Sequence, residues 1–338
     1  MTSVTSFEAD ALPHPVHIHA LSWMSAEQAL SWHAVLAASL AHDLPGQPPP
    51  TPKQVHSQLT TAGLDSRRLF WVATEPDGTV AGVAALRLFT RSGQEHLAEL
   101  ELHVHPQRRR LGVGSQLLAQ VVFAARVENR RSLVTSVADV EPGTAFCAAR
   151  SFRRVLTLRH LLLDLSEVDD SAAEDNPTGY RLASWGGVVP DDLSDAFATA
   201  KNAMNDMPTG DMDYGEQRWD ADRVRAMARV LADRGDTLLT VAALHGDVVA
   251  GFTETVIRAG EDQRALQYDT VVVPEHRGHG LGLWMKAAMV RQLRTDHPGI
   301  GAIETDNADD NTHMLAVNES LGFREHRRAH EYQLDVPA

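Results

Sequence analysis

The chain has 338 residues, of which 43% are hydrophobic and 22% charged, and its formal net charge is −14 at pH 7. This length exceeds the size at which a single hydrophobic core usually stops growing, so we expect two domains. The acidic charge argues against a nucleic-acid partner, because phosphate backbones favour a basic surface.

The composition also constrains the compartment and the metal chemistry. No apolar run is long enough to span a bilayer, and the first residues lack the basic start and apolar stretch of a secretory signal. We therefore expect a cytoplasmic protein with no membrane partner. The one cysteine, Cys147, excludes an intramolecular disulfide, and no helical pair of histidines has a nearby third ligand, so no metal is expected.

The first half of the chain begins with a helix and continues with strands. Residues 26–42 carry apolar side chains at helical spacing. Two apolar segments, 70–74 and 80–89, flank a Pro-Asp-Gly turn, which predicts a strand pair. A Gly-rich passage and a helix follow, and the alternating residues 155–163 predict a last strand.

The second half repeats this order of elements after an acidic segment rich in Ser and Asp, which we interpret as a linker. A helix is predicted over 191–204, a strand pair over 237–244 and 248–257, and a last strand over 324–336. The resulting division is a domain over 1–165, a linker over 166–178 and a domain over 179–338.

An internal repeat supports this division. In the passages 100–118 and 268–285, an extended apolar stretch ends in Pro, and Arg-x-x-Gly-x-Gly follows three residues later and opens a helix. The separation of Arg109 from Arg277 is close to that of two Ser-Trp pairs, one in each half, at 22–23 and 184–185. One duplicated unit explains both coincidences.

The glycines of the repeated passages suggest a phosphate site. A strand that feeds a Gly-rich turn leaves backbone N–H groups at the positive end of the next helix, a geometry that binds pyrophosphate. The alternative is that Gly-x-Gly only makes a tight turn, but two copies at matched positions favour binding. A dinucleotide fingerprint does not fit, because Leu117 and Met285 stand where its third glycine belongs.

These passages resemble the acetyl-CoA signature of the GNAT superfamily of N-acyltransferases, Val-x-Pro-x-x-Arg/Gln-x-x-Gly-x-Gly/Ala before a helix. Residues 305–323 are similar to the Asn…Ala…Gly-Phe ending of that family, and 145–152 are a weaker version. The resemblance covers almost the whole chain and extends to tandem double-domain members. It implies an α/β (α+β) fold of two GNAT-like domains, each a mixed, mostly antiparallel splayed sheet with helices on both faces.

The resemblance also implies acetyl-CoA as the acyl donor. In the second half the matching cofactor-binding residues are Val272, Val273, Arg277, Gly278, His279, Gly280, Leu281, Gly282, Asn307 and Asn311. In the first half they are Val104, Arg109, Arg110, Leu111, Gly112, Val113, Gly114 and Ser115.

The sequence departs from the family at the acid that protonates the leaving thiolate. Many members place a tyrosine four residues before the Gly of the final Gly-Phe, where this chain has Asn318 and, in the first half, Cys147. Asparagine cannot donate a proton as an acid, so either another donor, with Tyr332 and His279 as the candidates, or direct protonation by solvent is implied. Cys147 is assigned no role.

Two carboxylates are the candidates for a general base. Glu254 and Asp269 each interrupt an apolar strand near the expected cleft, and perturbed carboxylates cluster at functional sites. The alternative is that each points to solvent or pairs with an arginine. In the first half, Glu99 and Glu101 share one face of a strand and are equivalent to them or merely solvated.

The two halves also differ in the segment after the first helix. Residues 204–223 are rich in Asp, as an acidic rim for a cationic acceptor would be, whereas the matching stretch of the first half is rich in Pro. A solvated acidic loop is the alternative. This difference favours the C-terminal half as the catalytic one.

Together these patterns predict an acetyl-CoA-dependent N-acetyltransferase acting on a small, cationic primary amine by direct transfer in a ternary complex. The alternative is a non-catalytic acyl-CoA-binding sensor or assembly module. We expect a monomer or a homodimer.

Overall fold

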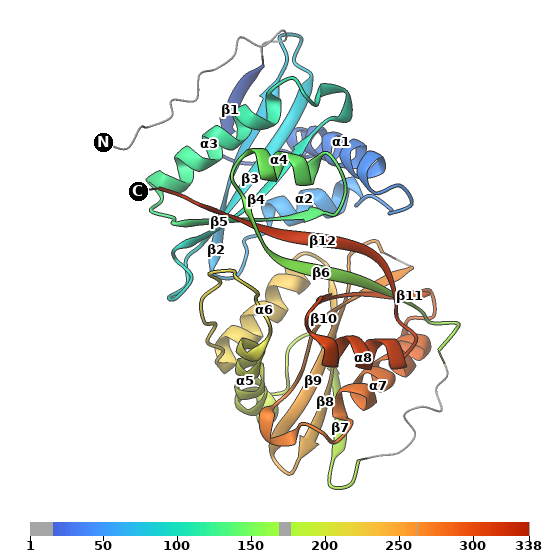
Figure 1. Cartoon of the computed structure of the whole chain (residues 1–338). Helices are drawn as coiled ribbons and strands as arrows, with labels where there is room; N and C mark the ends of the chain where they lie inside the picture. Colours follow the sequence, from blue (N-terminus) through green and yellow to red (C-terminus); the bar gives the residue numbers. More distant parts are fainter. Residues whose placement is uncertain (1–15, 169–176, 262, 338) are drawn as a thin grey trace.

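The computed structural model describes residues 16–168, 177–261 and 263–337 (Figure 1). Most of the predicted linker over 166–178 lies outside these residues, and the division into two domains stays a prediction. Within the described part of the chain, no helix is both long and apolar enough to cross a membrane.

Twelve strands form one continuous sheet, in the order β1-β2-β3-β4-β5-β12-β6-β11-β10-β9-β8-β7. The strands of the first half are β1 (His17–Leu21), β2 (Ser66–Thr74), β3 (Val80–Phe89), β4 (Leu97–Val104), β5 (Ser132–Ala138) and β6 (Arg153–Asp164). Those of the second half are β7 (Arg181–Gly186), β8 (Thr237–His245), β9 (Val248–Ile257), β10 (Arg264–Val272), β11 (Ala302–Ala308) and β12 (Arg324–Asp335). Only the β4–β5 and β10–β11 pairs are parallel.

Helices cover both faces of the sheet in each half (Figure 1). The helices are α1 (Ala26–Asp43), α2 (Pro52–Thr60), α3 (Val113–Val127), α4 (Gly143–Ala149), α5 (Ser194–Asn202), α6 (Ala221–Asp233), α7 (Leu281–Asp296) and α8 (Thr312–Ser320). In the first half, α1 and α2 bury Trp32 and Val55 in one core, and α3 buries Leu117 in another. In the second half, α5 buries Phe197 in one core and α7 buries Met285 in another. The predicted α/β fold with a mostly antiparallel sheet is confirmed.

Helix α2 lies in the Pro-rich stretch of the first half, for which the sequence analysis named no helix. Thr51 caps it, accepting a hydrogen bond from the backbone N–H of Gln54, whose side chain in turn accepts one from the backbone of Thr51. Pro52 takes the first helical position, where its missing N–H costs nothing. One of the prolines that make this stretch unlike a helix in the sequence, Pro52, is therefore the residue at which the helix begins.

The last strands of the two halves have changed places. Residues 329–335 of β12 pair with the whole length of β5, whereas β6 pairs with β11 of the second half. β6 and β12 pair with each other at the centre of the sheet. Each half therefore completes its sheet with a strand supplied by the other.

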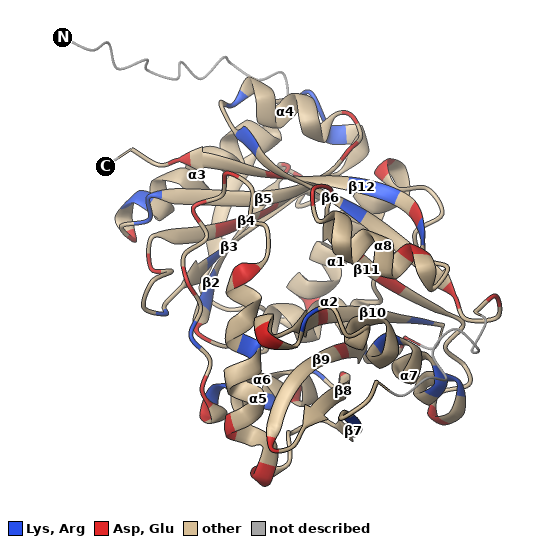
Figure 2. Cartoon of the chain, turned by 60° about the horizontal axis from the view of Figure 1, so that its bottom comes forward, with Lys and Arg blue, Asp and Glu red and all other residues tan. Residues whose placement is uncertain are grey.

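A buried ionic cluster stands where the exchanged strands meet, and basic positions mark β6 and β12 in Figure 2. Glu304 on β11 is 8% exposed, and its carboxylate accepts hydrogen bonds from Arg264 (2.9 Å) and Arg327 (2.7 Å). His160 and His326 lie at 3.6 and 3.5 Å from the same carboxylate. Burial would raise the pKa of Glu304, but the hydrogen bonds and positive charges of these neighbours lower it well below its usual range.

Removal of residues 324–338, which deletes β12, tests the exchange. We expect the N-terminal half to lose its cooperative unfolding, because β5 would present an unpaired apolar edge and the core would lose Tyr332 and Val336. Near-ultraviolet circular dichroism and tryptophan fluorescence, which report on Trp32 and Trp71, would follow the loss. A chain shortened only by residues 337–338 is the control. Native spectra in the longer deletion would contradict the exchange.

Candidate active site

In each half, a parallel strand pair opens into a gap. β10 and β11 are paired only over Arg264–Leu266 and Ala302–Glu304, after which β10 continues to Val272 with β9 as its partner. β4 and β5 diverge in the same way after three paired residues. Beyond the divergence, the facing edges of the two strands leave backbone groups available to a ligand.

The backbone N–H of Val272 is directed into this gap. Val273 donates its N–H to the carbonyl of Ala250 on β9 (3.0 Å), and successive peptide groups of a strand point to opposite sides. The same reasoning applies in the first half, where His105 donates to Ala81 and Val104 precedes it. Both valines named from the sequence thus offer a donor for the negative charge that develops on a carbonyl oxygen.

The glycine loop of the second half is open. Gly278 and Gly280 adopt positive φ angles of 83° and 73°, and a Cβ added at either, or at Gly282, would meet no atom within 4 Å. Gly280 precedes the first turn of α7, so the free N–H groups of that turn are accessible. The Leu281 side chain is buried in the core, so only its backbone is placed to bind a ligand.

The corresponding loop of the first half is covered. A Cβ at Gly114 would lie 3.4 Å from the ring of Phe146 on α4, and Arg150 hydrogen-bonds the hydroxyl of Ser115. Gly112 has a φ of 79°, like its counterpart, and Val113 is buried. The flanking residues Arg110 and Leu111 are at least partly exposed.

Both loop arginines have partners within the protein. Arg109 forms a bidentate pair with Asp43 (2.6 and 2.7 Å), and Arg277 bonds Asp206 at 2.9 Å. Each also donates its Nε to a carbonyl at the end of the preceding strand. The arginines therefore tie their loops to the helix region before them, a role that the sequence reasoning did not assign.

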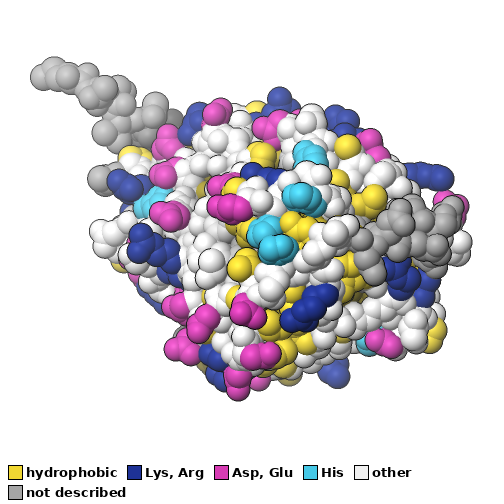
Figure 3. Space-filling model, turned by 90° about the horizontal axis from the view of Figure 1, so that it is seen from below, with side chains coloured by type: hydrophobic (Ala, Val, Ile, Leu, Met, Phe, Trp, Pro, Cys, Tyr) yellow, Lys and Arg dark blue, Asp and Glu magenta, His cyan; other side chains and the backbone are white. Residues whose placement is uncertain are grey.

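Histidines surround the open loop, on the face seen in Figure 3. His276 bonds the hydroxyl of Tyr180 at 2.9 Å, and the rings of His279 and His245 lie 5.6 and 5.2 Å from the Tyr180 ring. His279, a sequence candidate for the acid, is thus exposed beside the loop. Among the residues that the structure describes, no group of three or more metal-ligating side chains could hold a metal ion.

A β-bulge distinguishes β10 from its counterpart. The register between β9 and β10 shifts between Gln267 and Thr270, so that Tyr268 and Asp269 form the irregular stretch, whereas β3 and β4 pair without interruption. Bulges re-aim side chains and are frequent beside active sites. The bulge therefore re-aims the Asp269 side chain, and the first half has no such bulge between β3 and β4.

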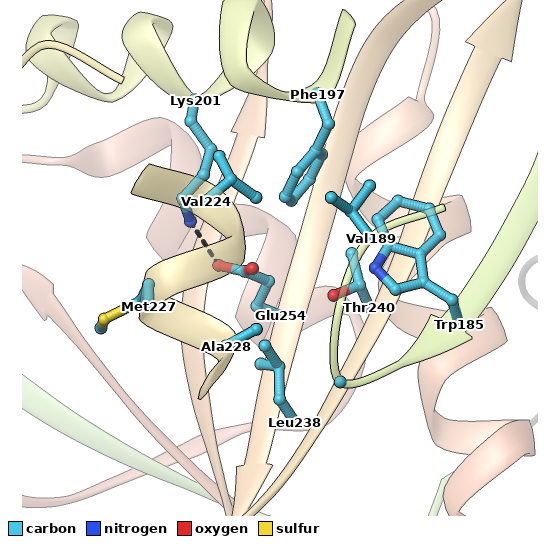
Figure 4. A pocket seen from close by; sticks show the side chains of 11 residues that line it. Trp185, Val189, Phe197, Lys201, Val224, Met227, Ala228, Leu238, Thr240 and Glu254 are labelled. Carbon is cyan, nitrogen blue, oxygen red and sulfur yellow. Dashed lines mark hydrogen bonds and ion pairs between the residues drawn. The ribbon is translucent and has the colours of Figure 1, made fainter. Parts of the chain in front are cut away.

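Asp269 and Glu254 meet at a buried lysine. Lys201 on α5 is 3% exposed, and its ammonium donates to Glu254 at 2.6 Å (Figure 4). It also donates to Asp269 at 2.9 Å. The rings of Trp219, Phe252 and Phe197 lie 4.8, 5.0 and 5.6 Å from it. The structure thus brings together the two carboxylates predicted from the sequence, with a cation that the prediction missed.

Burial and the neighbouring charges have opposite effects within the trio of Lys201, Glu254 and Asp269. Burial lowers the pKa of Lys201, but the Asp269 and Glu254 charges outweigh it and raise that pKa, so the lysine stays cationic. Burial raises the pKa of Glu254 despite the neighbouring ammonium. With both carboxylates ionised the trio carries one negative charge, and Asp269, whose side chain is 36% exposed, is its accessible end.

A small pocket adjoins the trio between α5, α6 and the sheet. Glu254 and Lys201 share it with apolar side chains such as Trp185, Phe197 and Val224 (Figure 4). The polar end of the pocket is therefore the carboxylate and ammonium pair.

The signal that could have found Lys201 is its rarity. The chain has only three lysines, and both Lys201 and Lys286 stand on helix faces that are otherwise apolar. A long cation at such a position needs a buried partner.

The prediction that Tyr332 serves the same site is corrected by the structure. The strand exchange places Tyr332 in the core of the first half, opposite Thr135 of β5, with Cys147 in the same core. It therefore does not lie with Glu254 and Asp269. The error came from the expectation that the last strand completes its own half.

The acidic segment 204–223 packs against the first half instead of standing free. The Asp213 side chain lies 3.2 Å from His96, and the Asp213 backbone N–H donates a hydrogen bond to the side-chain oxygen of Gln333. Gln94 donates to the backbone oxygen of Tyr214. Part of this segment is therefore an inter-half contact, a role that the acidic-rim interpretation did not include.

Asn311 and Asn307 have different roles in the second half. Asn311 caps α8, accepting a hydrogen bond from the backbone N–H of Met314. Asn307 on β11 accepts a hydrogen bond from Asn318 (2.5 Å), which accepts one from Lys286 (2.6 Å). Lys286 and Asn318 are buried, at 3% and 0% exposure.

Comparison with known proteins agrees with this geometry. The sequence matches the acetyltransferase (GNAT) family over residues 36–149 and 202–323, one match in each half. The chain therefore belongs to the GNAT family of acetyltransferases, an enzyme family, and its tandem arrangement is confirmed.

Within that family, the chain is similar to proteins named mycothiol acetyltransferase. The protein of Rhodococcus erythropolis is 28% identical over 280 residues, 80% of this chain and 86% of its own length. That of Renibacterium salmoninarum is 30% identical over 295 residues, 85% and 82% of the two chains. The solved structure of a tandem GNAT protein from the clavulanic acid biosynthesis pathway has a TM-score of 0.81 and 27% identity, and covers 96% of this chain and 99% of its own.

The pKa of Lys286 gives a prediction about stability. Burial lowers that pKa from 10.5 to about 7, so between these values the unfolded chain holds a proton that the folded chain has released. The burial cost is fully present below pH 7 and disappears above pH 10.5. We therefore expect the Lys286 contribution to make the free energy of unfolding rise with pH across this window, by about 1.4 kcal/mol per pKa unit at most.

Urea unfolding of Lys286→Leu beside the wild type, at pH values from 6 to 10, measures this rise as a difference between the two proteins. The advantage of the variant should shrink as pH increases. Lys53→Leu, at an exposed position of α2, should leave the pH dependence unchanged. A constant difference between wild type and Lys286→Leu would contradict the assignment.

Proposed function

We propose that the protein is an acetyl-CoA-dependent N-acetyltransferase whose C-terminal half acetylates a small, cationic primary amine by direct transfer in a ternary complex. The observation that carries this proposal is the bulge of β10, which sets the partly exposed carboxylate of Asp269 three residues before the gap-facing amide of Val272. A base and an oxyanion donor thereby stand on one strand. The first half lacks that bulge.

The glycine loop of the second half fits the donor. Its glycines leave open space where the backbone would approach a pyrophosphate, and the start of α7 contributes free N–H groups and a positive dipole end. Acetyl-CoA would supply the acetyl group as a thioester. The chain's own contribution is to hold the phosphates at residues 277–282 and to donate the N–H of Val272 to the thioester oxygen.

The trio fits the acceptor. Its net negative charge favours a cationic amine at the exposed side of Asp269, while Lys201 and Glu254 keep that carboxylate in place from behind. Asp269 accepts one proton from the cationic amine, and the neutral nitrogen then attacks the thioester carbonyl without a covalent enzyme intermediate. The C–S bond breaks as the C–N bond forms, and the leaving CoA thiolate takes up the second proton that the nitrogen loses. Relatives named mycothiol acetyltransferase support a small-molecule acceptor.

A second candidate is a non-catalytic acyl-CoA-binding module. The buried Asn318 at the position of the family's tyrosine favours it, because no acid stands there to protonate the thiolate. Turnover separates the two candidates, since only the enzyme needs Asp269 as a base.

Substitution of the carboxylates tests the catalytic proposal. For Asp269→Asn we expect kcat to fall by about a hundredfold or more, the usual contribution of a general base, with acetyl-CoA affinity unchanged. Glu254→Gln should lower kcat less, because it acts through Lys201. Glu101→Gln, at the matched position of the first half, is the control and should behave like the wild type. Full activity of Asp269→Asn in amine acetylation assays would refute the assignment.

Substitution of the loop glycines counts the donor sites. In calorimetric titration with acetyl-CoA, Gly280→Asp should abolish binding, because a carboxylate at the helix start repels the pyrophosphate. Gly112→Asp should leave one intact site, because the first loop is covered by Phe146. The reverse pattern would move the working site to the first half, and failure of the wild type to bind would end the acetyl-CoA proposal.

A further inference from the structure

A directed chain of hydrogen bonds lies between α7, α8 and β11. Lys286 donates to the side-chain oxygen of Asn318 at 2.6 Å, and the Asn318 amide donates to the side-chain oxygen of Asn307 at 2.5 Å. Within the described ranges, no carboxylate lies within ion-pair distance of Lys286, whose nearest ring is that of Phe323 at 5.5 Å. The buried Lys286 ammonium thus donates to a neutral amide and not to a carboxylate.

The first half shows that the fold does not need this series of hydrogen bonds. The shared pattern Thr-x-x-Ala-Asp aligns Asn307 with Val137, and the glycine motif aligns Lys286 with Leu118. Cys147 matches Asn318. All three residues of the first half pack in or against an apolar core. Since a buried lysine costs stability that leucine does not, its presence in one half only points to a function there.

The hydrogen bonds from Lys286 through Asn318 to Asn307 all run in one donor-to-acceptor direction. While Lys286 is protonated, its ammonium has donors only, so it holds the Asn318 oxygen toward α7 and turns the Asn318 amide toward β11. The oxygen of Asn307 is then occupied, and its own NH₂ group is directed away from Asn318. Without the lysine, both amides could rotate and exchange donor for acceptor.

Asn307 lies where such a donor can reach a ligand. It is partly exposed and follows Glu304, the last residue of β11 that is paired with β10. It is on the same face of β11 as Ile303, which packs in the α7 core. The Asn307 amide thus stands at the opening of the gap, on the side where α7 and the glycine loop begin.

We propose that Lys286, acting through Asn318, is a positioning residue that presents the Asn307 amide as a hydrogen-bond donor to a carbonyl oxygen of the acyl-CoA arm in the gap between β10 and β11. This inference rests on the proposed acetyl-CoA site. It gives the asparagine at the tyrosine position a role that needs no proton transfer.

A variant built from the first half tests the proposal. The triple substitution Lys286→Leu, Asn307→Val and Asn318→Cys copies the three apolar residues of that half. We expect it to unfold at the same or a higher urea concentration than the wild type. Its affinity for acetyl-CoA should fall about tenfold, the effect of one lost hydrogen bond to the ligand.

Single variants and a shorter ligand separate positioning from structural support. Asn307→Val should lose as much affinity as the triple variant, and Lys286→Leu should lose affinity only while Asn307 is present. Adenosine 3′,5′-bisphosphate, which lacks the acyl-CoA arm, should bind all variants equally in competition titrations, and a merely structural role would not give this split.

The outcomes are distinct. Unchanged acetyl-CoA affinity in the triple variant would overturn the inference while leaving the proposed function in place. Additive losses from Lys286→Leu and Asn307→Val would overturn the positioning role of the lysine. Failure of the wild type to bind acetyl-CoA would overturn the proposed function and this inference with it.

Discussion

β12 is hydrogen-bonded to β5 on one side and to β6 on the other, and this pairing holds the molecule together. Because β6 pairs with β11 on its other side, the two halves share one uninterrupted sheet. The cluster around Glu304 adds charge-assisted hydrogen bonds at the same place, where Arg264 and Arg327 together balance the buried carboxylate. The gap of each half opens beside these central strands, so the geometry of both gaps depends on the exchange.

The duplication lets one half serve as the reference for the other. Positions that are apolar in the first half are polar in the second: Ala85 corresponds to Glu254, and Leu118 to Lys286. The shared fold shows that the apolar residues satisfy the core, so the polar ones are additions that stability alone does not explain. The loops differ as well, since Phe146 lies against that of the first half and that of the second is open.

Local patterns predicted what depends on neighbours in the sequence. The glycine loops, their αL residues and the strand pairs around 76–78 and 245–247 follow from spacing, and all are present in the structure. The partners of Arg109 and Lys201 could not be predicted, because they come from elements distant in sequence. The exchange itself was hidden for a physical reason: β6 and β12 are equally good last strands, and alternation does not say which edge each one joins.

The order of synthesis turns the exchange into a folding constraint. The first half leaves the ribosome early, yet the strand that closes its sheet is translated only after the other strands of both halves. Until then β5 offers an open apolar edge, a template for unwanted pairing with other chains. From the synthesis of β5 (Ser132–Ala138) to that of β12 (Arg324–Asp335), the edge of β5 is therefore without its native partner.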